Sequence, residues 1–139
     1  MLENMEYEPR YLEGIRHFNA CEFYEAHEVW EELWADCRGP IREFYQGLIQ
    51  VAVALHHFGN GNIRGAIKLY HSSRKHLQPY FPNHLGCDTR HLFIEMEECF
   101  AELLEGKEDF PSIKMNPEFI PEIHLDPVPS VIGGEQQCG

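Results

Sequence analysis

The sequence predicts an all-α fold: a compact single-domain bundle of about five helices, followed by an extended, proline-rich C-terminal arm. Three observations support this class. Apolar residues recur three and four positions apart along most of the chain, no segment alternates as a strand does, and prolines gather after residue 109. We therefore expect the helical domain over residues 1–108 and the arm over residues 109–139.

Composition narrows the classes of function. The chain has 139 residues, of which 43% are hydrophobic, so one domain with a packed core is expected. Its net charge of −12 predicts no nucleic-acid partner, because phosphate backbones repel an acidic surface. There is no apolar run of membrane-spanning length and no signal-peptide pattern, so we expect no membrane partner and a cytoplasmic location. The five cysteines form no CxxC pair, which predicts reduced thiols.

The first two helices are predicted from about Pro9 to Phe18 and from about Glu22 to Cys37. The segment "NACE" separates them, and Asn19 is a candidate cap or turn residue. Apolar residues of the second helix follow one helical face: Phe23, Ala26, Trp30, Leu33 and Cys37. "RGP" is expected to end this helix and to begin the next.

The third helix is predicted from about Pro40 to Phe58. No Lys, Arg, Asp or Glu occurs between Glu43 and Arg64, so this helix is apolar nearly all round. Such a helix is usually central and buried. We therefore expect the other helices to pack around it.

The fourth and fifth helices are predicted from about Ile63 to Leu77 and from about Thr89 to Glu105. Asp88 is the expected cap of the fifth helix, and Gly106 its expected end. The fourth helix carries a basic stripe at helical spacing, formed by Arg64, Lys68, His71 and Lys75. Three interpretations remain: a solvated face, an anion site, or a surface for an acidic partner such as the Glu25, Glu28 and Glu32 face of the second helix.

His27 and Glu31 form the most specific polar pair of the second helix. They lie four residues apart, so their side chains can meet beside the apolar face. This pair predicts a ligand or metal site, a general base with its orienting carboxylate, or a structural hydrogen bond between packed helices. The segment "HEVWE" differs from the zinc-protease pattern HExxH, because Glu31 replaces the second histidine. We therefore do not expect protease chemistry.

The third helix offers polar partners for this pair. Gln46, Gln50 and His57 share one stripe of an otherwise apolar helix, and they are expected to face His27 and Glu31 if the two helices pack antiparallel. The alternative is that the stripe faces water. The candidate ligand-binding residues are therefore His27, Glu28, Glu31, Trp34, Gln46, Gln50 and His57. A divalent transition metal would be held by His27 and Glu31.

Two segments carry a family resemblance. "FNACEFYEAHEVWEELW" and "REFYQGLIQVAVALHHFGNGNIRGAIKLY" resemble the signature of the domain of unknown function 309 family, a group of small all-helical bacterial and archaeal proteins. The resemblance spans about residues 11–105 and implies a compact helical bundle. It also implies a set of typical polar positions, which match Glu25, His27, Glu28, Trp34, Gln46, Gln50, His56 and His57. It implies no particular reaction.

The sequence leaves two functions open. The first is a small-ligand or metal-binding site between the second and third helices, with Trp30 and Trp34 as apolar walls. The second is a structural or protein-interaction module in which the polar cluster is only a packing network. A homodimer through the third helix or through the C-terminal arm belongs to this second hypothesis. The sequence does not decide whether the protein is an enzyme.

Overall fold

The computed structural model describes residues 6–106 and 113–129. Within them it is mostly helical, with six α-helices and no β-strand, which confirms the all-α prediction. The helices are α1 (Pro9–Asn19), α2 (Phe23–Asp36), α3 (Ile41–Gly59), α4 (Ile63–Leu77), α5 (Thr89–Cys99) and α6 (Ala101–Leu104). The described residues also include two short 3₁₀ turns, η1 (Gln78–Tyr80) and η3 (Pro117–Phe119).

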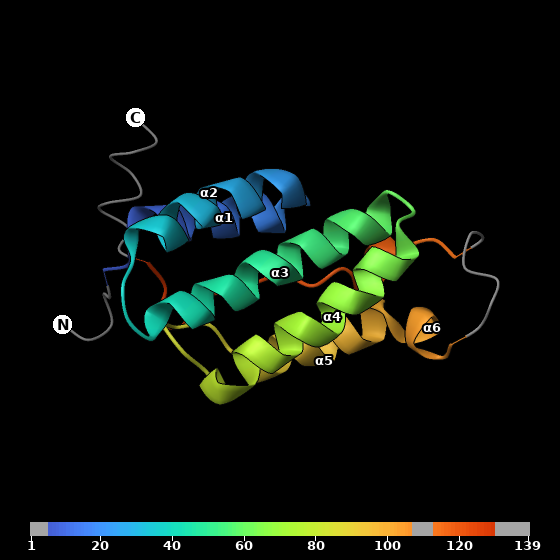
Figure 1. The fold of residues 1–139 in the computed structure, drawn as a ribbon. Helices are drawn as coiled ribbons and strands as arrows, with labels where there is room; N and C mark the ends of the chain where they lie inside the picture. The colour runs from blue at the N-terminus through green and yellow to red at the C-terminus, as the bar shows by residue number, and fades with distance from the viewer. Residues whose placement is uncertain (1–5, 107–112, 130–139) are drawn as a thin grey trace.

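Helix α3 is the centre of the bundle (Figure 1). The α1–α2 hairpin packs along one side of it, and α4 and α5 pack along the other. Ten residues of α3 are buried, as its apolar composition predicts: Phe44, Tyr45, Gly47, Leu48, Ile49, Val51, Ala52, Ala54, Leu55 and Phe58. Because short turns join α2 to α3 and α3 to α4, each neighbour runs antiparallel to α3.

Helix boundaries follow local capping chemistry. The Asp88 carboxylate accepts a hydrogen bond from His91 N at 2.8 Å, which confirms the predicted cap of α5. The Asn62 side chain accepts one from Gly65 N at 3.1 Å at the start of α4. Gly39, at φ +81°, adopts the left-handed conformation in the turn that leads from α2 into α3.

The α1–α2 contact depends on Trp30. Its side chain is fully buried, and the indole N–H donates to the Tyr11 carbonyl at 3.3 Å. A Cβ at Gly14 would lie 2.0 Å from Trp30 Nε1, so only glycine lets the two helices approach this closely. The second helix is therefore a core helix on this side, with Trp30 as its main anchor.

A second close approach joins α3 to α4. A Cβ at Gly47 would lie 2.5 Å from the Leu77 side chain and 3.3 Å from His76 Cβ. Gly47 is the glycine of the "QGLIQ" segment. This glycine therefore sets the distance at which α4 packs on the central helix.

The predicted fifth helix is two helices in the structure. α5 ends at Cys99, Phe100 leaves the helical conformation at φ −97° and ψ 9°, and α6 begins at Ala101. Phe100 is fully buried and packs against Phe58 and Tyr70, with ring centroids 5.2 Å and 5.1 Å away. Because apolar spacing continues through this point, periodicity alone did not separate the two helices.

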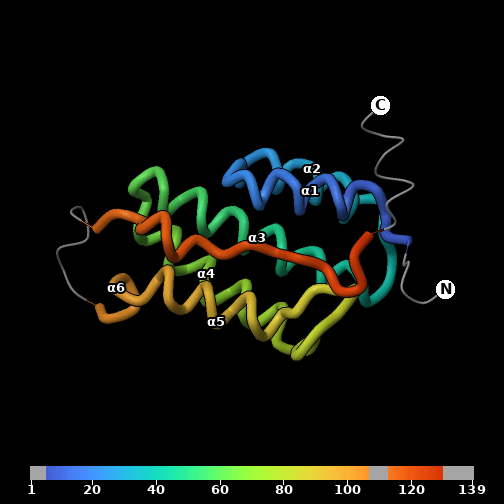
Figure 2. The backbone as a smooth tube through the Cα atoms, turned by 180° about the vertical axis from the view of Figure 1, so that it is seen from behind, coloured from blue at the N-terminus to red at the C-terminus, as the bar shows by residue number. Residues whose placement is uncertain are grey.

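Residues 113–129 run as a mainly irregular segment along the opposite side of the bundle from the view of Figure 1, as Figure 2 shows. Ile123 and Leu125 of this segment are buried against the core. Of the predicted 109–139 arm, residues 109–112 and 130–139 lie outside the described residues. We call residues 113–129 the arm segment.

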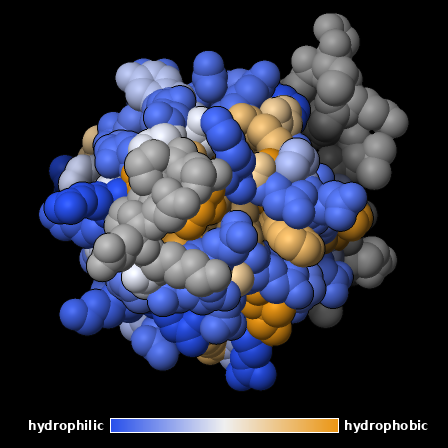
Figure 3. Space-filling view, turned by 90° about the vertical axis from the view of Figure 1, so that its right-hand side faces the viewer, coloured by the Kyte–Doolittle hydropathy of each residue, from blue (hydrophilic) through white to orange (hydrophobic). Residues whose placement is uncertain are grey.

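The side of the molecule drawn in Figure 3 is mainly hydrophilic, with small separate apolar patches. Within the described ranges, no helix combines the length and the apolar composition that a membrane span requires. Cys87 and Cys99 are buried free thiols, and burial raises the pKa of each to about 12. They therefore behave as small apolar core residues, while Cys138 lies outside the described residues.

Candidate functional site

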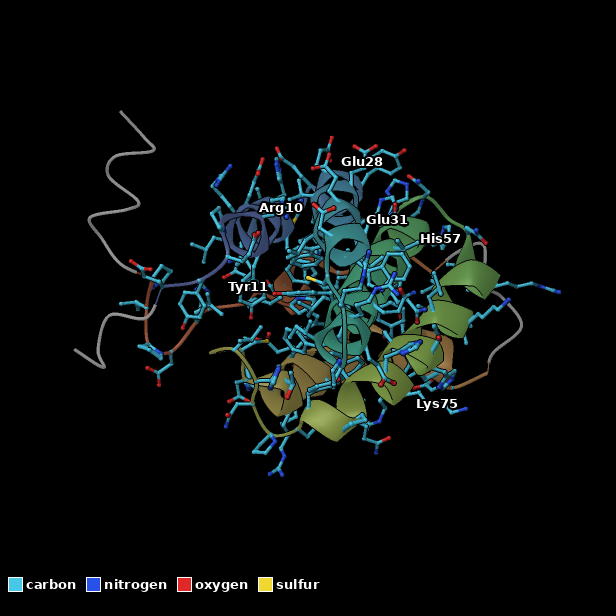
Figure 4. The ribbon with its side chains drawn as sticks, turned by 60° about the vertical axis from the view of Figure 1, so that its left-hand side comes forward. Arg10, Tyr11, Glu28, Glu31, His57 and Lys75 are labelled. Carbon is cyan, nitrogen blue, oxygen red and sulfur yellow. The ribbon has the colours of Figure 1, made fainter. Side chains whose placement is uncertain are left out.

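The candidate residues lie on the side of the bundle where α2, α3 and α4 are next to one another. Figure 4 shows Glu31, His57 and Lys75 on this same side, on α2, α3 and α4 respectively. We call this surface the α2–α3–α4 face. Helical spacing and the contacts described below place on it His27, Glu31 and Trp34 of α2, Gln46, Gln50, Val53 and His57 of α3, and Leu69, Ser72 and His76 of α4.

His27 and Glu31 meet as their spacing predicts. His27 Nε2 lies 3.4 Å from a Glu31 carboxylate oxygen, and His27 Nδ1 lies 3.1 Å from the Tyr24 carbonyl oxygen. Both ring nitrogens therefore face oxygen acceptors, and only a ring that carries both protons donates to both. The His27 side chain is half-buried, with 18% of its area exposed, whereas Glu31 is 56% exposed.

The geometry does not complete a metal site at this pair. A transition metal needs three or more protein ligands in most protein sites, and His27 and Glu31 supply two. Among the residues that the structure describes, no group of three or more His, Cys, Asp or Glu side chains is arranged to hold a metal ion. The residues present therefore do not fit the divalent metal that the sequence suggested.

The glutamines of α3 are half-buried but do not bond to the pair on α2. Within the described part of the chain, no hydrogen bond joins Gln46 or Gln50 to His27 or Glu31. The side-chain oxygen of Gln50 is buried and has no hydrogen-bond partner. An unsatisfied amide oxygen at such a position carries a free-energy cost, so it is a candidate for contact with a binding partner.

His57 is held by the turn between α3 and α4. Asn62 Nδ2 lies 3.3 Å from His57 Nδ1, and the same asparagine caps α4 through its oxygen. A Cβ at Gly65 would lie 3.0 Å from a His57 ring carbon, so the ring packs against the first turn of α4. Burial, with a smaller contribution from His56, lowers the pKa of His57. The neutral ring can then accept from Asn62.

A ring cluster links the start of α2 to the end of α3. The Tyr24 ring lies 5.2 Å from His27 and 5.4 Å from His56 between ring centroids. His56 Nε2 lies 3.1 Å from Asn60 Nδ2. A cavity of about 430 Å³ beside this cluster is lined by Tyr24, His56 and Met115 among others. Gln46, Gln50 and His57 do not line this cavity, so it does not connect the predicted site residues.

Trp34 and Glu28 have different surroundings. The guanidinium carbon of Arg42 lies 3.8 Å from the Trp34 ring centroid, and Arg42 Nε donates to the Trp34 carbonyl at 3.2 Å. This cation–π contact closes the α2–α3 turn. Glu28 is exposed on the outer side of α2, away from His57 (Figure 4). The structure therefore brings His27, Glu31 and Trp34 onto the α2–α3–α4 face but leaves Glu28 at its rim.

Sequence reasoning missed His76. Its Nδ1 is buried without a hydrogen-bond partner, and it lies 3.6 Å from a Glu43 carboxylate oxygen across the α3–α4 contact. Ser72 and His76 lie four residues apart on the flank of α4 that faces α3. Only the α3–α4 pairing, set by Gly47, could have shown that His76 shares a face with Gln50.

Comparison with known proteins supports the family resemblance. The family model described as "Domain of unknown function (DUF309)" matches residues 11–69. An uncharacterized protein of Aquifex aeolicus (strain VF5) is 46% identical over 46 residues, which are 32% of this chain and 14% of that protein. The uncharacterized protein YpuF of Bacillus subtilis (strain 168) is 32% identical over 111 residues, which are 77% of this chain and 63% of that protein.

The matched region coincides with the structural centre of the site. Residues 11–69 include most of α1, all of α2 and α3 and the start of α4, and with them every predicted site residue. The chain spans less than two thirds of the length of either relative. The resemblance inferred from the sequence is confirmed over this region: residues 11–69 match the DUF309 family model.

Proposed function

We propose that this domain is a protein-interaction module that self-associates through the α2–α3–α4 face. The observation that carries the proposal is the opposite charge of the two edges of this face. Its α2 edge carries the exposed carboxylates Glu28 and Glu31, and its α4 edge carries the exposed amine of Lys75. Lys68 is also exposed and lies on the same stripe of α4, two turns earlier. A surface that is acidic at one edge and basic at the other is complementary to a rotated copy of itself.

The symmetry of the pairing follows from this charge pattern. A twofold axis that runs along α3 places α2 of one copy over α4 of its partner, twice in the same dimer. Each acidic edge then meets a basic edge, whereas an axis across α3 would bring like charges together. The polar stripe of α3 lies at the centre of such an interface, where one copy of Gln46 and Gln50 meets the other.

Two unpartnered atoms support an interface at this stripe. Gln50 Oε1 and His76 Nδ1 are, among the side chains of the described residues, the buried polar atoms without a hydrogen-bond partner, and both belong to this face. An amide side chain both donates and accepts, so two Gln50 side chains that turn toward each other across a twofold axis would satisfy one another. Pairing would therefore remove a cost that the single chain carries.

This function is preferred to a small-ligand site because the α3 stripe lines none of the cavities described. Those cavities lie beside the arm segment, beside α6, or beside Tyr24 and His56. The self-association proposal needs a broad face and not a hollow. We also propose that the protein is located in the cytoplasm, as the sequence predicts.

The proposal is tested by sedimentation equilibrium of the full chain over a range of concentrations. The wild type is expected to form a dimer. Reversing the acidic edge (Glu28→Lys with Glu31→Lys) or the basic edge (Lys68→Glu with Lys75→Glu) should each raise the dimer Kd by roughly tenfold or more, because like charges then face each other. The chain that carries all four changes should regain the wild-type Kd.

Recovery of the wild-type dimer Kd in the chain with all four changes is the discriminating result, because it requires the two edges to meet in the dimer. Arg90→Glu with Glu97→Lys, which reverses exposed charges of α5 away from this face, is the matched control and should leave the Kd unchanged. A monomer at every concentration contradicts the proposal. So does a dimer whose Kd is indifferent to both edge variants.

A further inference from the structure

The arm segment binds the opposite side of the bundle in the manner of a bound peptide. Figure 2 shows it running along this side, between α1 and α5. From residue 121 its side chains alternate: Pro121, Ile123 and Leu125 are buried, and Glu122, His124 and Asp126 are exposed. This is the period of an extended chain with one face against a surface. The bundle therefore offers sockets to every second residue.

The bundle also recognises the main chain of the arm segment. The Asn19 side chain donates to the Ile123 carbonyl at 2.8 Å and accepts from Ile123 N at 2.8 Å. The Gly86 carbonyl accepts from Asp126 N at 2.9 Å. Main-chain hydrogen bonds combined with alternate side-chain sockets are how extended peptides are bound by protein grooves.

Further main-chain contacts extend this recognition at both ends. A Glu95 carboxylate oxygen accepts from Glu122 N at 3.3 Å, and the Tyr7 hydroxyl donates to the Pro127 carbonyl at 2.5 Å. All of these contacts involve only backbone atoms of the arm segment, so another peptide of similar shape could make them. The donors and acceptors on the bundle side come from α1, from α5 and from the residues that flank them.

The site extends beyond the space that the arm segment fills. A cavity of about 900 Å³ lies along α1 beside the arm, lined by Leu12 and Ile15 of α1 and by Leu125 and Val128 of the arm. Val128 projects over this cavity with 61% of its area exposed. An occupant with a larger apolar residue after the second socket would therefore find additional apolar surface to bury.

We propose that the groove between α1 and α5 is a binding site for extended peptides and that residues 120–127 are its built-in occupant. The ligand is a peptide in trans with branched apolar residues two positions apart, as Ile123 and Leu125 are. Its intervening side chains face water and are not selected. The arm and the peptide compete for the same sockets. The apparent affinity for the peptide is therefore the intrinsic affinity multiplied by the fraction of molecules in which the arm has left the groove.

The test uses the full chain and a fluorescent peptide of residues 118–129, EFIPEIHLDPVP, with fluorescence anisotropy as the readout. Wild type should bind it weakly. Leu125→Ala, and more strongly Ile123→Asp with Leu125→Asp, loosen the arm and should lower the apparent Kd, by about tenfold or more for the double variant. A peptide with Asp at the two socket positions is the control and should not bind.

Asn19→Ala in the arm-loosened chain identifies the groove. Loss of two main-chain hydrogen bonds should raise the peptide Kd by about tenfold. Asn60→Ala should leave it unchanged, because the Asn60 side chain contacts His56 and makes no hydrogen bond to the arm segment. Should the double aspartate variant fail to fold by circular dichroism, Leu125→Ala carries the comparison. No binding to any folded arm-loosened chain, or binding indifferent to Asn19, overturns the proposal. The dimer Kd is measured separately and does not decide this result.

Discussion

Trp30 shows how one residue sets the distance between two helices. Its ring fills the space above Gly14, and its N–H reaches the Tyr11 carbonyl one turn earlier on α1. The Phe18 ring lies 6.0 Å from it, and the Phe23 ring lies 5.2 Å from Phe18, so an aromatic group closes the α1–α2 hairpin. A buried tryptophan of this kind makes a large contribution to the core.

Gly14→Ala tests this packing. Alanine would gain up to about 1 kcal/mol of helix propensity, but its Cβ cannot fit 2.0 Å from the indole, and overpacking of this kind costs typically about 1–3 kcal/mol or more. We expect a net loss of about 2 kcal/mol in the free energy of unfolding, measured by urea denaturation. Gly59→Ala is the matched control, because its Cβ would lie 3.5 Å from Met115 Cε, an ordinary contact. Equal effects of the two changes would contradict the account.

The His57 ring packs against the turn that joins α3 to α4. Its pKa is lowered from 6.5, so the folded chain holds the neutral ring where the unfolded chain takes up a proton. The sign follows from linkage: this contribution is complete above the unfolded value and is lost as the pH falls below it towards the folded pKa. His84, whose pKa burial also lowers, acts in the same direction.

The free energy of unfolding is therefore expected to fall as the pH is lowered from about 7.5 to about 5.5. His57→Gln keeps an acceptor for Asn62 but removes the titration, and it should make this fall smaller. Urea denaturation at several pH values measures it, with His71→Gln, a change at an exposed position of α4, as control. A His57→Gln chain with the wild-type pH dependence would show that this ring does not couple to folding.

The sequence could identify these residues as polar or aromatic but not their long-range contacts. Trp30 was predicted to point inward, and it does. Asn19 was expected to be a local cap, whereas its side chain bonds to Ile123, more than a hundred residues away in the chain. Helical periodicity reports which side of its own helix a residue occupies, and it carries no information about a partner so distant.

At the scale of elements, α3 combines a buried body with one polar stripe. Gln46, Gln50 and His57 follow the side of α3 that α2 and α4 leave partly uncovered. Of the three, Gln50 has a buried oxygen without a partner. Among the described residues, the stripe therefore holds the one side-chain polar atom of α3 that is buried without a hydrogen-bond partner.

The Gln50→Leu change separates the effect of this amide on the stability of the single chain from its effect on the affinity of the proposed dimer. In the single chain it removes an unpartnered buried oxygen, so the free energy of unfolding should stay unchanged or rise by about 1 kcal/mol. In the proposed dimer it removes the central amide, so the dimer Kd should rise by roughly tenfold. Chemical denaturation at low protein concentration and sedimentation equilibrium measure the two effects.

Gln78→Leu, at an exposed position in η1, is the matched control and should alter neither quantity. A large loss of stability in Gln50→Leu would mean that the amide is engaged within the single chain, which would remove one support of the proposed interface.

Most elements could be predicted because local signals agree with the tertiary packing. α4 has the predicted bounds, and the other long helices differ by a residue or two at their ends. The exception is the break between α5 and α6 at Phe100, where burial against Phe58 and Tyr70 decides the backbone and the spacing of apolar residues does not change. The predicted site residues lie on α2 and α3, and the face proposed here for self-association also includes α4.

At the scale of the whole molecule, charge is distributed unevenly. The net charge is −12, yet Arg64, Lys68 and Lys75 expose three cations on one helix. An acidic chain that concentrates cations along one edge, opposite an acidic edge, has the pattern that orients association. The sequence suggested that the basic stripe could meet the acidic face of the second helix, and the fold places these two helices, α4 and α2, on either side of α3.

Because this association depends on exposed charges, salt should weaken it. Raising the ionic strength from about 0.05 M to about 0.5 M shortens the screening length to a few ångströms and should raise the dimer Kd several-fold. The fourfold variant, which keeps both charge types with their edges exchanged, should show the same dependence. A Kd that does not respond to salt would indicate that apolar contacts alone hold the two copies together.

The most direct measurement mixes two variants that cannot pair with themselves. One carries Glu28→Lys with Glu31→Lys, so both of its edges are basic, and the other carries Lys68→Glu with Lys75→Glu, so both are acidic. The account predicts that each alone sediments as a monomer at concentrations where the wild type is a dimer, and that an equimolar mixture forms a one-to-one dimer. A mixture that remains monomeric, beside a wild type that dimerises, would contradict pairing of α2 with α4 across the α2–α3–α4 face.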